Sequence, residues 1–256
     1  MRGKKLSSWF SKLAQVGRKA VSPPAEGADA TPPMELHGPR VTVRPMRRSD
    51  LEAMMRWQPA TDPLYQPFDL PKRSRAEHMQ WFDWRRRDTS RRLYVIENEE
   101  QQVIGSLTLR EIVGRRTARL GITIGADFVS RGYGTEALHL FLDYFFGEMG
   151  FARMVLDVAA TNQRAVRTYR ALGFRPTGQH YRVADHAGYH VVHRDPRYRH
   201  LHRFFRKKGG TLQVLFYDMA LTREQWQAHK AQAGKGRQPK HPAAVKATDR
   251  SETVQA

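Results

Sequence analysis

The chain of 256 residues contains no cysteine, which excludes disulfides and thiolate metal sites and is compatible with a reducing compartment. It also lacks any apolar run approaching the roughly 18 residues of a membrane-spanning helix. His186, His190 and His193 suggest a metal at first sight, but no framework of carboxylates or cysteines accompanies them. We therefore expect a protein of the cytoplasm that holds no metal.

Acidic residues are too few to balance the basic ones. Against 25 Asp and Glu stand 44 Lys and Arg, so the net charge is +19. This surplus predicts an anionic partner, such as a nucleotide, nucleic acid, ribosome or acidic membrane. A basic surface that serves solubility is the simpler alternative. Residues 1–20 contain six Lys or Arg and no acid, and their apolar residues follow helical spacing, which predicts a basic amphipathic helix. This segment lacks the apolar core of a secretory signal, although an Arg-rich organelle-targeting peptide would look similar.

Composition divides the chain into three parts. Residues 1–35 hold the basic segment and a linker rich in proline and small residues, with nothing to bury. Residues 36–229 have apolar patterns and are expected to form the folded domain, with a basic insertion at 182–210. Residues 230–256 are polar, contain proline and lysine, and are expected to be a disordered tail.

Hydrophobic periodicity within residues 36–229 predicts an α/β protein around a mixed sheet, with the order β, α, α, β, β, β, α, β, α, β, β. Ser49 with Glu52, and Ser74 with Glu77, predict capping boxes at the first two helices. The apolar run at 153–160 predicts a strand buried on both faces. Gly173 is expected to end the last helix in the left-handed conformation.

Gly132 and Gly134 directly precede a strongly apolar helix. Glycines at such a turn let the backbone approach a ligand, and the start of the helix attracts phosphate through free N–H groups and its dipole. The spacing is not the dinucleotide fingerprint, because Ala137 stands at the third glycine, and the Gly-Lys-Ser/Thr ending of a P-loop is absent. Taken alone, the pair is equally well explained by a plain turn.

The segments RGYGTEAL and ATNQRAVRTYRALGFRPTG, separated by an apolar strand, resemble the two central motifs of the GNAT N-acyltransferase superfamily. Within it, the chain is most similar to ribosomal-protein N-terminal acetyltransferases of the Rim type, over roughly residues 40–226. The resemblance implies the GNAT fold, a mixed and mostly antiparallel sheet flanked by helices. It also implies acetyl-CoA as cosubstrate.

The resemblance further implies which residues bind coenzyme A. The family's phosphate-binding turn and the opening of its helix match Val129, Ser130, Arg131, Gly132, Tyr133, Gly134 and Thr135. Val129 departs from the family's Arg or Gln, so one anchoring side chain is lost, and Arg131 could supply charge instead. Asn162 would orient the pantetheine arm or the following helix, which is compatible with a role as N-cap. Backbone groups of the fourth strand, at Ile122, Thr123 and Ile124, would pair with the pantetheine and polarise the thioester carbonyl.

Tyr169 matches the family's tyrosine near the cofactor sulfur, where a phenol could protonate the departing thiolate. A packed tyrosine of an amphipathic helix is the alternative. The attacking amine must lose a proton, yet the fourth strand offers no carboxylate, where many relatives place one. Glu111 is the first candidate for this base and Asp157 the second, and either could instead pair with an arginine.

The resemblance thus predicts an acetyl-CoA-dependent N-acetyltransferase acting on a primary amine of a protein N-terminus or another peptide-like acceptor. A small-molecule N-acetyltransferase of the aminoglycoside or metabolite type and a degenerate domain that binds polyanions are the alternatives. The insertion at 182–210 has eight Arg or Lys against two Asp, with aromatic residues between them, which suits RNA or another polyanion. The basic segments could attach the protein to a ribosome or an anionic membrane.

Overall fold

A computed structural model describes residues 34–235 of the chain. The predicted basic helix, the linker up to residue 33 and the part of the predicted tail from residue 236 lie outside the described residues. None of the described helices is both long enough and apolar enough to cross a membrane.

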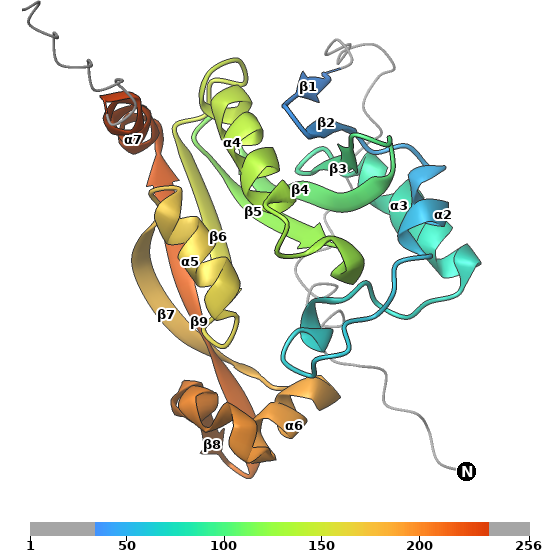
Figure 1. Ribbon diagram of the computed structural model, residues 1–256, viewed down its shortest axis with the longest axis vertical. Helices are drawn as coiled ribbons and strands as arrows, with labels where there is room; N and C mark the ends of the chain where they lie inside the picture. Colours follow the sequence, from blue (N-terminus) through green and yellow to red (C-terminus); the bar gives the residue numbers. More distant parts are fainter. Residues whose placement is uncertain (1–33, 236–256) are drawn as a thin grey trace, which may run out of the picture.

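The described residues form a nine-stranded sheet with the order β1-β2-β3-β4-β5-β6-β9-β7, and β8 pairs with β9 outside this path (Figure 1). Every pair is antiparallel except β5 with β6. The strands are β1 Leu36–His37, β2 Val41–Pro45, β3 Arg92–Asn98, β4 Val103–Val113, β5 Thr117–Ile124, β6 Arg153–Ala159, β7 Arg175–Val183, β8 Phe205–Lys208 and β9 Thr211–Thr222. The predicted mixed and mostly antiparallel sheet is confirmed.

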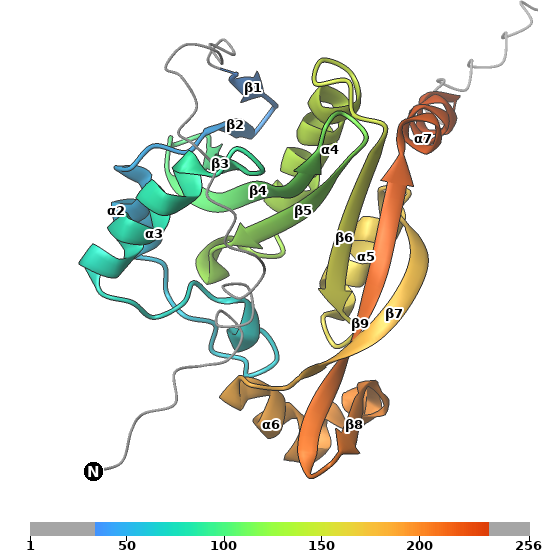
Figure 2. The same cartoon turned by 180° about the vertical axis from the view of Figure 1, so that it is seen from behind.

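Helices cover the two faces of this sheet unequally (Figures 1 and 2). The α-helices are α2 Asp50–Met54, α3 Arg75–Arg87, α4 Tyr133–Phe146, α5 Gln163–Ala171, α6 Ala187–Arg194 and α7 Arg223–Lys235, and the 3₁₀ turns are η1 Gln66–Phe68, η2 Ala126–Phe128 and η3 Pro196–Phe204. The helices α4 and α5 pack on one face, where Tyr94 and Ile96 of β3 belong to their core. Val95, between them, points to the other face and packs with α2 and α3. Successive side chains of β3 therefore contribute to two separate cores, one on each face of the sheet.

One of the two predicted capping boxes is present. The Ser74 hydroxyl accepts from the Glu77 amide and the Glu77 carboxylate accepts from the Ser74 amide, so α3 begins as predicted. The box at Ser49 is wrong, because Ser49 makes no side-chain cap hydrogen bond and already has helical angles. The Glu52 carboxylate that should reach back to Ser49 instead accepts a hydrogen bond of 2.6 Å from Arg75 Nε, at the start of α3.

The end of the domain lies further along the chain than expected. The helix α7 continues to Lys235, so the boundary predicted at residue 229 is too early. Trp226 anchors this helix: it is buried against α4, and its indole N–H donates to Asp143 Oδ1 at 2.8 Å. Lys230 pairs with the same carboxylate, one turn further along α7. The polar composition of α7 thus led the sequence analysis to end the domain too early, although this helix packs on the domain.

Candidate active site

The strands β5 and β6 part soon after they meet (Figure 1). They form three parallel residue pairs, the last of which joins Arg119 to Val155. Beyond it, β5 stays paired with β4 as far as Ile124, and β6 stays paired with β9 as far as Ala159. Within the described residues, the facing edges of β5 and β6 are therefore unpaired beyond that point. A sheet that opens in its middle offers backbone donors and acceptors to an extended ligand.

The backbone of β5 faces this opening at alternate residues. The Gly125 amide donates to the Ile104 carbonyl of β4 at 2.9 Å, and Ile124 lies opposite Gly105. Because backbone groups alternate sides along an antiparallel pair, those of Ile122 and Ile124 point away from β4 and toward the opening. The groups of Thr123 point to β4. Of the three residues predicted on this strand, the structure thus directs two toward the opening.

The turn from Val129 to Thr135 follows β5 after the short η2 turn and opens α4. Ser130 and Gly132 both have positive φ, of 63° and 88°. The amides of Thr135 and Glu136 donate to the Gly132 carbonyl, and the amides before them lie at the helix end, where no intrahelical acceptor exists. A Cβ on Gly134 would lie 3.3 Å from Ile124 Cγ1, so the turn packs against the end of β5. This turn and the parted strands therefore lie side by side.

Two arginines that the sequence did not indicate flank this turn. Arg40 donates to the Arg131 carbonyl at 3.0 Å and through Nε to the Glu136 carboxylate, also at 3.0 Å. It thereby neutralises the acid in the first turn of α4, which would otherwise repel an anionic ligand. Arg164 of α5 donates to the Ser130 hydroxyl at 3.3 Å. Arg40 lies 91 residues from Arg131 and Arg164 lies 34 residues from Ser130, so no local pattern could reveal these contacts.

Helix α5 carries the other two predicted site residues. The Asn162 side chain accepts from the Ala165 amide at 3.1 Å, so its role as N-cap is confirmed. Tyr169 is 8% exposed and packs edge-on against the Phe174 ring at 5.7 Å between centroids. Burial and, to a smaller extent, the nearby charge of Asp157 raise the pKa of the Tyr169 phenol. This phenol therefore keeps its proton at neutral pH and can donate it.

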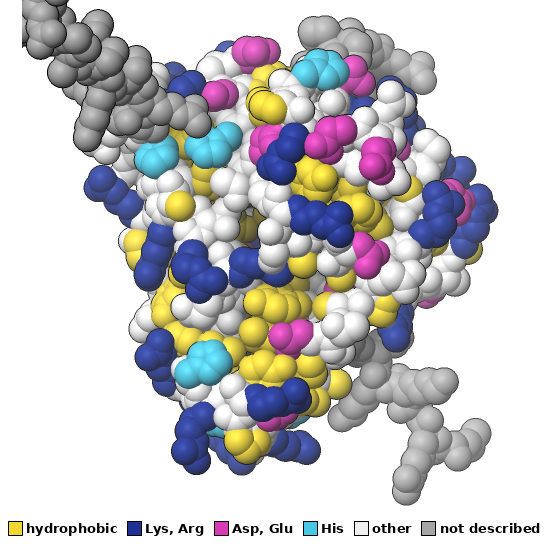
Figure 3. All heavy atoms as spheres, viewed as in Figure 1, with side chains coloured by type: hydrophobic (Ala, Val, Ile, Leu, Met, Phe, Trp, Pro, Cys, Tyr) yellow, Lys and Arg dark blue, Asp and Glu magenta, His cyan; other side chains and the backbone are white. Residues whose placement is uncertain are grey.

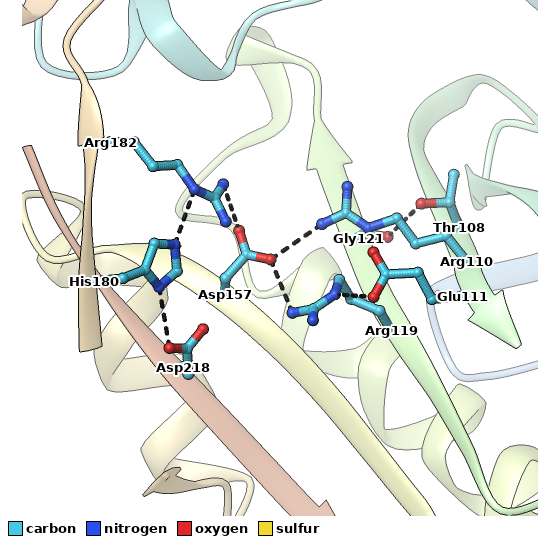
Figure 4. Close-up of polar contacts among 9 residues, drawn as sticks. All are labelled: Thr108, Arg110, Glu111, Arg119, Gly121, Asp157, His180, Arg182 and Asp218. Carbon is cyan, nitrogen blue, oxygen red and sulfur yellow. Dashed lines mark hydrogen bonds and ion pairs between the residues drawn. The ribbon is translucent and has the colours of Figure 1, made fainter. Parts of the chain in front are cut away.

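Asp157 of β6 gathers three arginines from three other strands (Figure 4). Arg182 of β7 lies 2.8 Å from its Oδ2, and Arg119 of β5 and Arg110 of β4 lie 3.1 and 3.2 Å from its Oδ1. Burial favours a higher pKa for Asp157, whose side chain is 7% exposed, but the three guanidinium groups outweigh it and lower the pKa. Asp157 stands two residues beyond the last β5–β6 pair, so its contact with Arg119 links these strands where they part.

Both predicted bases are engaged by arginine side chains. Glu111 Oε2 accepts from Arg119 Nε at 2.7 Å, and the Glu111 side chain is 57% exposed. On β4 it stands four residues beyond Leu107, which pairs with Ile122, and thus lies about 13 Å along the strand from the backbone groups of Ile122. Asp157 lies closer, but its low pKa and three arginine partners leave it little affinity for a proton.

An ion pair between a histidine and an aspartate, which the sequence did not predict, lies beside the Asp157 cluster (Figure 4). His180 Nδ1 lies 3.0 Å from Asp218 Oδ2, and Arg182 Nε donates to His180 Nε2 at 2.9 Å. A guanidinium N–H can only donate, so His180 Nε2 is the accepting nitrogen and its lone pair is occupied. Among the described residues, no group of three or more histidines and carboxylates could hold a metal.

Comparisons with known proteins agree with this geometry. A family model described as acetyltransferase (GNAT) domain matches residues 40–175. Spermidine N(1)-acetyltransferase of Escherichia coli K12 is 30% identical over 141 residues, 54% of this chain and 75% of that protein. The Vibrio cholerae enzyme of the same name is 26% identical over 140 residues, 54% of this chain and 81% of its own.

A solved structure of Vibrio cholerae spermidine N-acetyltransferase in complex with CoA and spermine has the same fold. It superposes with a TM-score of 0.55 at 22% identity, over 73% of this chain and 98% of that one. These relatives are named as spermidine acetyltransferases and not as ribosomal-protein acetyltransferases. The sequence-based assignment to the Rim-type branch is thereby corrected.

Proposed function

Because the chain belongs to the GNAT family of acetyl-CoA-dependent N-acetyltransferases, we propose that its acceptor is the primary amine of a small molecule. The relatives are named for spermidine, a small amine, which supports this acceptor over a protein N-terminus. The observation that carries the reaction itself is the opening between β5 and β6, with the turn at residues 129–135 at one side and Tyr169 on the helix that follows β6.

Acetyl-CoA fits this site through backbone groups. The left-handed turn presents amides to the pyrophosphate, and the dipole of the 14-residue helix α4 adds to the attraction. Val129 supplies no charge here, and we assign that role to Arg131 and to Arg164, whose guanidinium reaches the Ser130 hydroxyl. The backbone groups of Ile122 and Ile124 pair with the pantetheine along the unpaired edge of β5 and polarise the thioester carbonyl.

The transfer is a direct attack on the thioester. The neutral amine adds to the carbonyl carbon, the carbon–sulfur bond breaks, and Tyr169 gives its proton to the departing thiolate. Because Glu111 is held by Arg119 and Asp157 by three arginines, we assign removal of the amine proton to water. The phenol regains a proton from solvent afterwards, which returns the site to its starting state.

The test is release of the coenzyme A thiol over a panel of amines. Spermidine, spermine, an aminoglycoside and a peptide with a free N-terminus cover the competing acceptor classes. We expect turnover with small amines, and Tyr169→Phe to lower kcat by about 10²-fold, since it keeps the ring and removes the proton. Tyr144→Phe, a buried tyrosine on α4, is the control and should leave kcat unchanged.

Each outcome bears on a different part of this proposal. Preference for the peptide would overturn the small-molecule acceptor and leave the chemistry standing. Equal kcat for the Tyr169→Phe variant and the wild type, with a lower melting temperature for the variant, would make Tyr169 a packing residue. No thiol release with any amine would sink the reaction as written.

A further inference from the structure

The end of the sheet that carries α6, η3 and β8 bears a concentration of positive charge (Figures 1 and 3). The sequence predicted a basic insertion here, and the structure turns it into two helical segments and a strand. Seven side chains on these elements are exposed, and we call them the basic end: Arg194, Arg197, Arg199, Arg203, Arg206, Lys207 and Lys208.

The basic end is not neutralised by its own surroundings. Arg197 pairs with Asp195 at 2.6 Å. In the part of the chain that the structure describes, the other six make no ion pair with a carboxylate. The remaining acid of the insertion, Asp185, precedes α6. Like charges held this close repel one another, and an anionic partner relieves that repulsion.

The basic end is also held in place. Tyr189, Val192, Leu201, Phe204 and Phe205 form a core of their own beneath it, separate from the core under α4. The Arg206 guanidinium lies 3.7 Å above the Tyr181 ring and donates to Gln213, and the Arg203 guanidinium lies 4.9 Å from the Phe204 ring. Guanidinium groups fixed on rings lose less freedom when they bind phosphate than free ones do.

We propose that the basic end binds the phosphodiester backbone of a nucleic acid. Guanidinium groups suit phosphate, and a line of phosphates matches charges spread over three consecutive elements. A membrane would need apolar side chains at the surface, but the insertion buries Tyr189, Phe204 and Phe205 and exposes only valines among its large apolar residues. Lysines on β8 could simply protect an edge strand, yet Arg194, Arg199 and Arg203 lie on helical segments.

This surface is distinct from the proposed catalytic groups. The Tyr198 hydroxyl of η3 donates to Asp62 at 2.7 Å, which fixes the insertion against the segment between α2 and α3. No residue of the basic end belongs to the turn at 129–135, to β5 or to α5. Loss of nucleic-acid binding should therefore leave acetyl-CoA turnover intact.

The experiment measures binding of the full chain to a fluorescent 20-nucleotide RNA and to DNA of the same sequence, by anisotropy over a range of salt. The test variant replaces Arg199, Arg203, Lys207 and Lys208 by Gln. The control replaces Arg86, Arg87, Arg115 and Arg116 by Gln; these are exposed and remove the same charge from α3 and from the β4–β5 turn. Thermal melting and thiol release confirm that both variants are folded and active.

We expect the test variant to bind at least about tenfold more weakly at 0.1 M salt. The slope of log K against log salt should fall in magnitude by about 3, since each lost phosphate contact contributes roughly 0.7–0.9. The control should change affinity less than threefold. Equal loss in both variants would mean that net charge alone attracts the strand, and unchanged binding in the test variant would overturn the surface. Binding to anionic vesicles but to neither nucleic acid would assign the surface to a membrane.

Discussion

Replacing Asp157 by Asn should destabilise the protein strongly. The substitution keeps the shape of the side chain and removes a carboxylate that lies within 3.2 Å of all three of Arg110, Arg119 and Arg182. The Asp157 side chain is 7% exposed and those of the arginines are 25–29% exposed, so solvent compensates poorly. Removing one partner of such a buried pair costs about 3–5 kcal/mol of unfolding free energy.

The matched control is Asp218→Asn. Asp218 lies on the neighbouring strand, and within residues 34–235 it forms an ion pair only with His180; both side chains are about a third exposed. Exposed pairs contribute about 0–1 kcal/mol, so the two substitutions should differ by several-fold in their effect on stability. Adding Arg182→Gln to Asp157→Asn should recover part of the loss, because one uncompensated guanidinium is then gone.

Urea unfolding followed by tryptophan fluorescence measures these differences, and pH separates their cause. The folded state lowers the pKa of Asp157, so its contribution is fully present above the unfolded value of about 3.9. It disappears as the pH falls through the lower folded value. The gap between wild type and Asp157→Asn should therefore be constant near pH 7 and close in acid. If Asp157→Asn lowers the unfolding free energy by less than about 1 kcal/mol, as little as Asp218→Asn does, then the Asp157 cluster does not stabilise the fold as a buried ion pair.

Two further predictions concern acetyl-CoA. Gly134→Val should weaken acetyl-CoA binding by at least about tenfold in calorimetry. Even a Cβ at this position would lie 3.3 Å from Ile124, so a branched side chain must displace the turn. Wild-type affinity in this variant would exclude the turn as the pyrophosphate site. Arg164→Gln should raise the KM for acetyl-CoA several-fold with kcat nearly unchanged. The control Arg167→Gln, at an exposed position on the same helix, should change neither constant. Equal effects of both substitutions would mean that Arg164 contributes only general positive charge.

Features specified by neighbours in sequence were predictable. The strand patterns, the capping box at Ser74 and the N-cap at Asn162 all depend on residues within a few positions of one another. The left-handed glycine at residue 173, with φ of 91°, follows from the same short range. The turn at 129–135 was found because its glycines and the helix after it are adjacent. The capping box at Ser49 could not be predicted correctly from neighbouring residues, because Glu52 binds Arg75 of another helix instead.

Only the tertiary structure decided how distant segments meet. Four strands bring together Asp157 and its arginines, and the pairing of β4 with β5 brings Glu111 to Arg119. Such contacts depend on pairing between strands far apart in sequence, which residue spacing does not encode. The parting of β5 from β6 and the docking of α7 through Trp226 likewise arise from packing across the whole domain. The sequence predicted the candidate site residues through short local motifs, and only the fold showed which distant residues contact them.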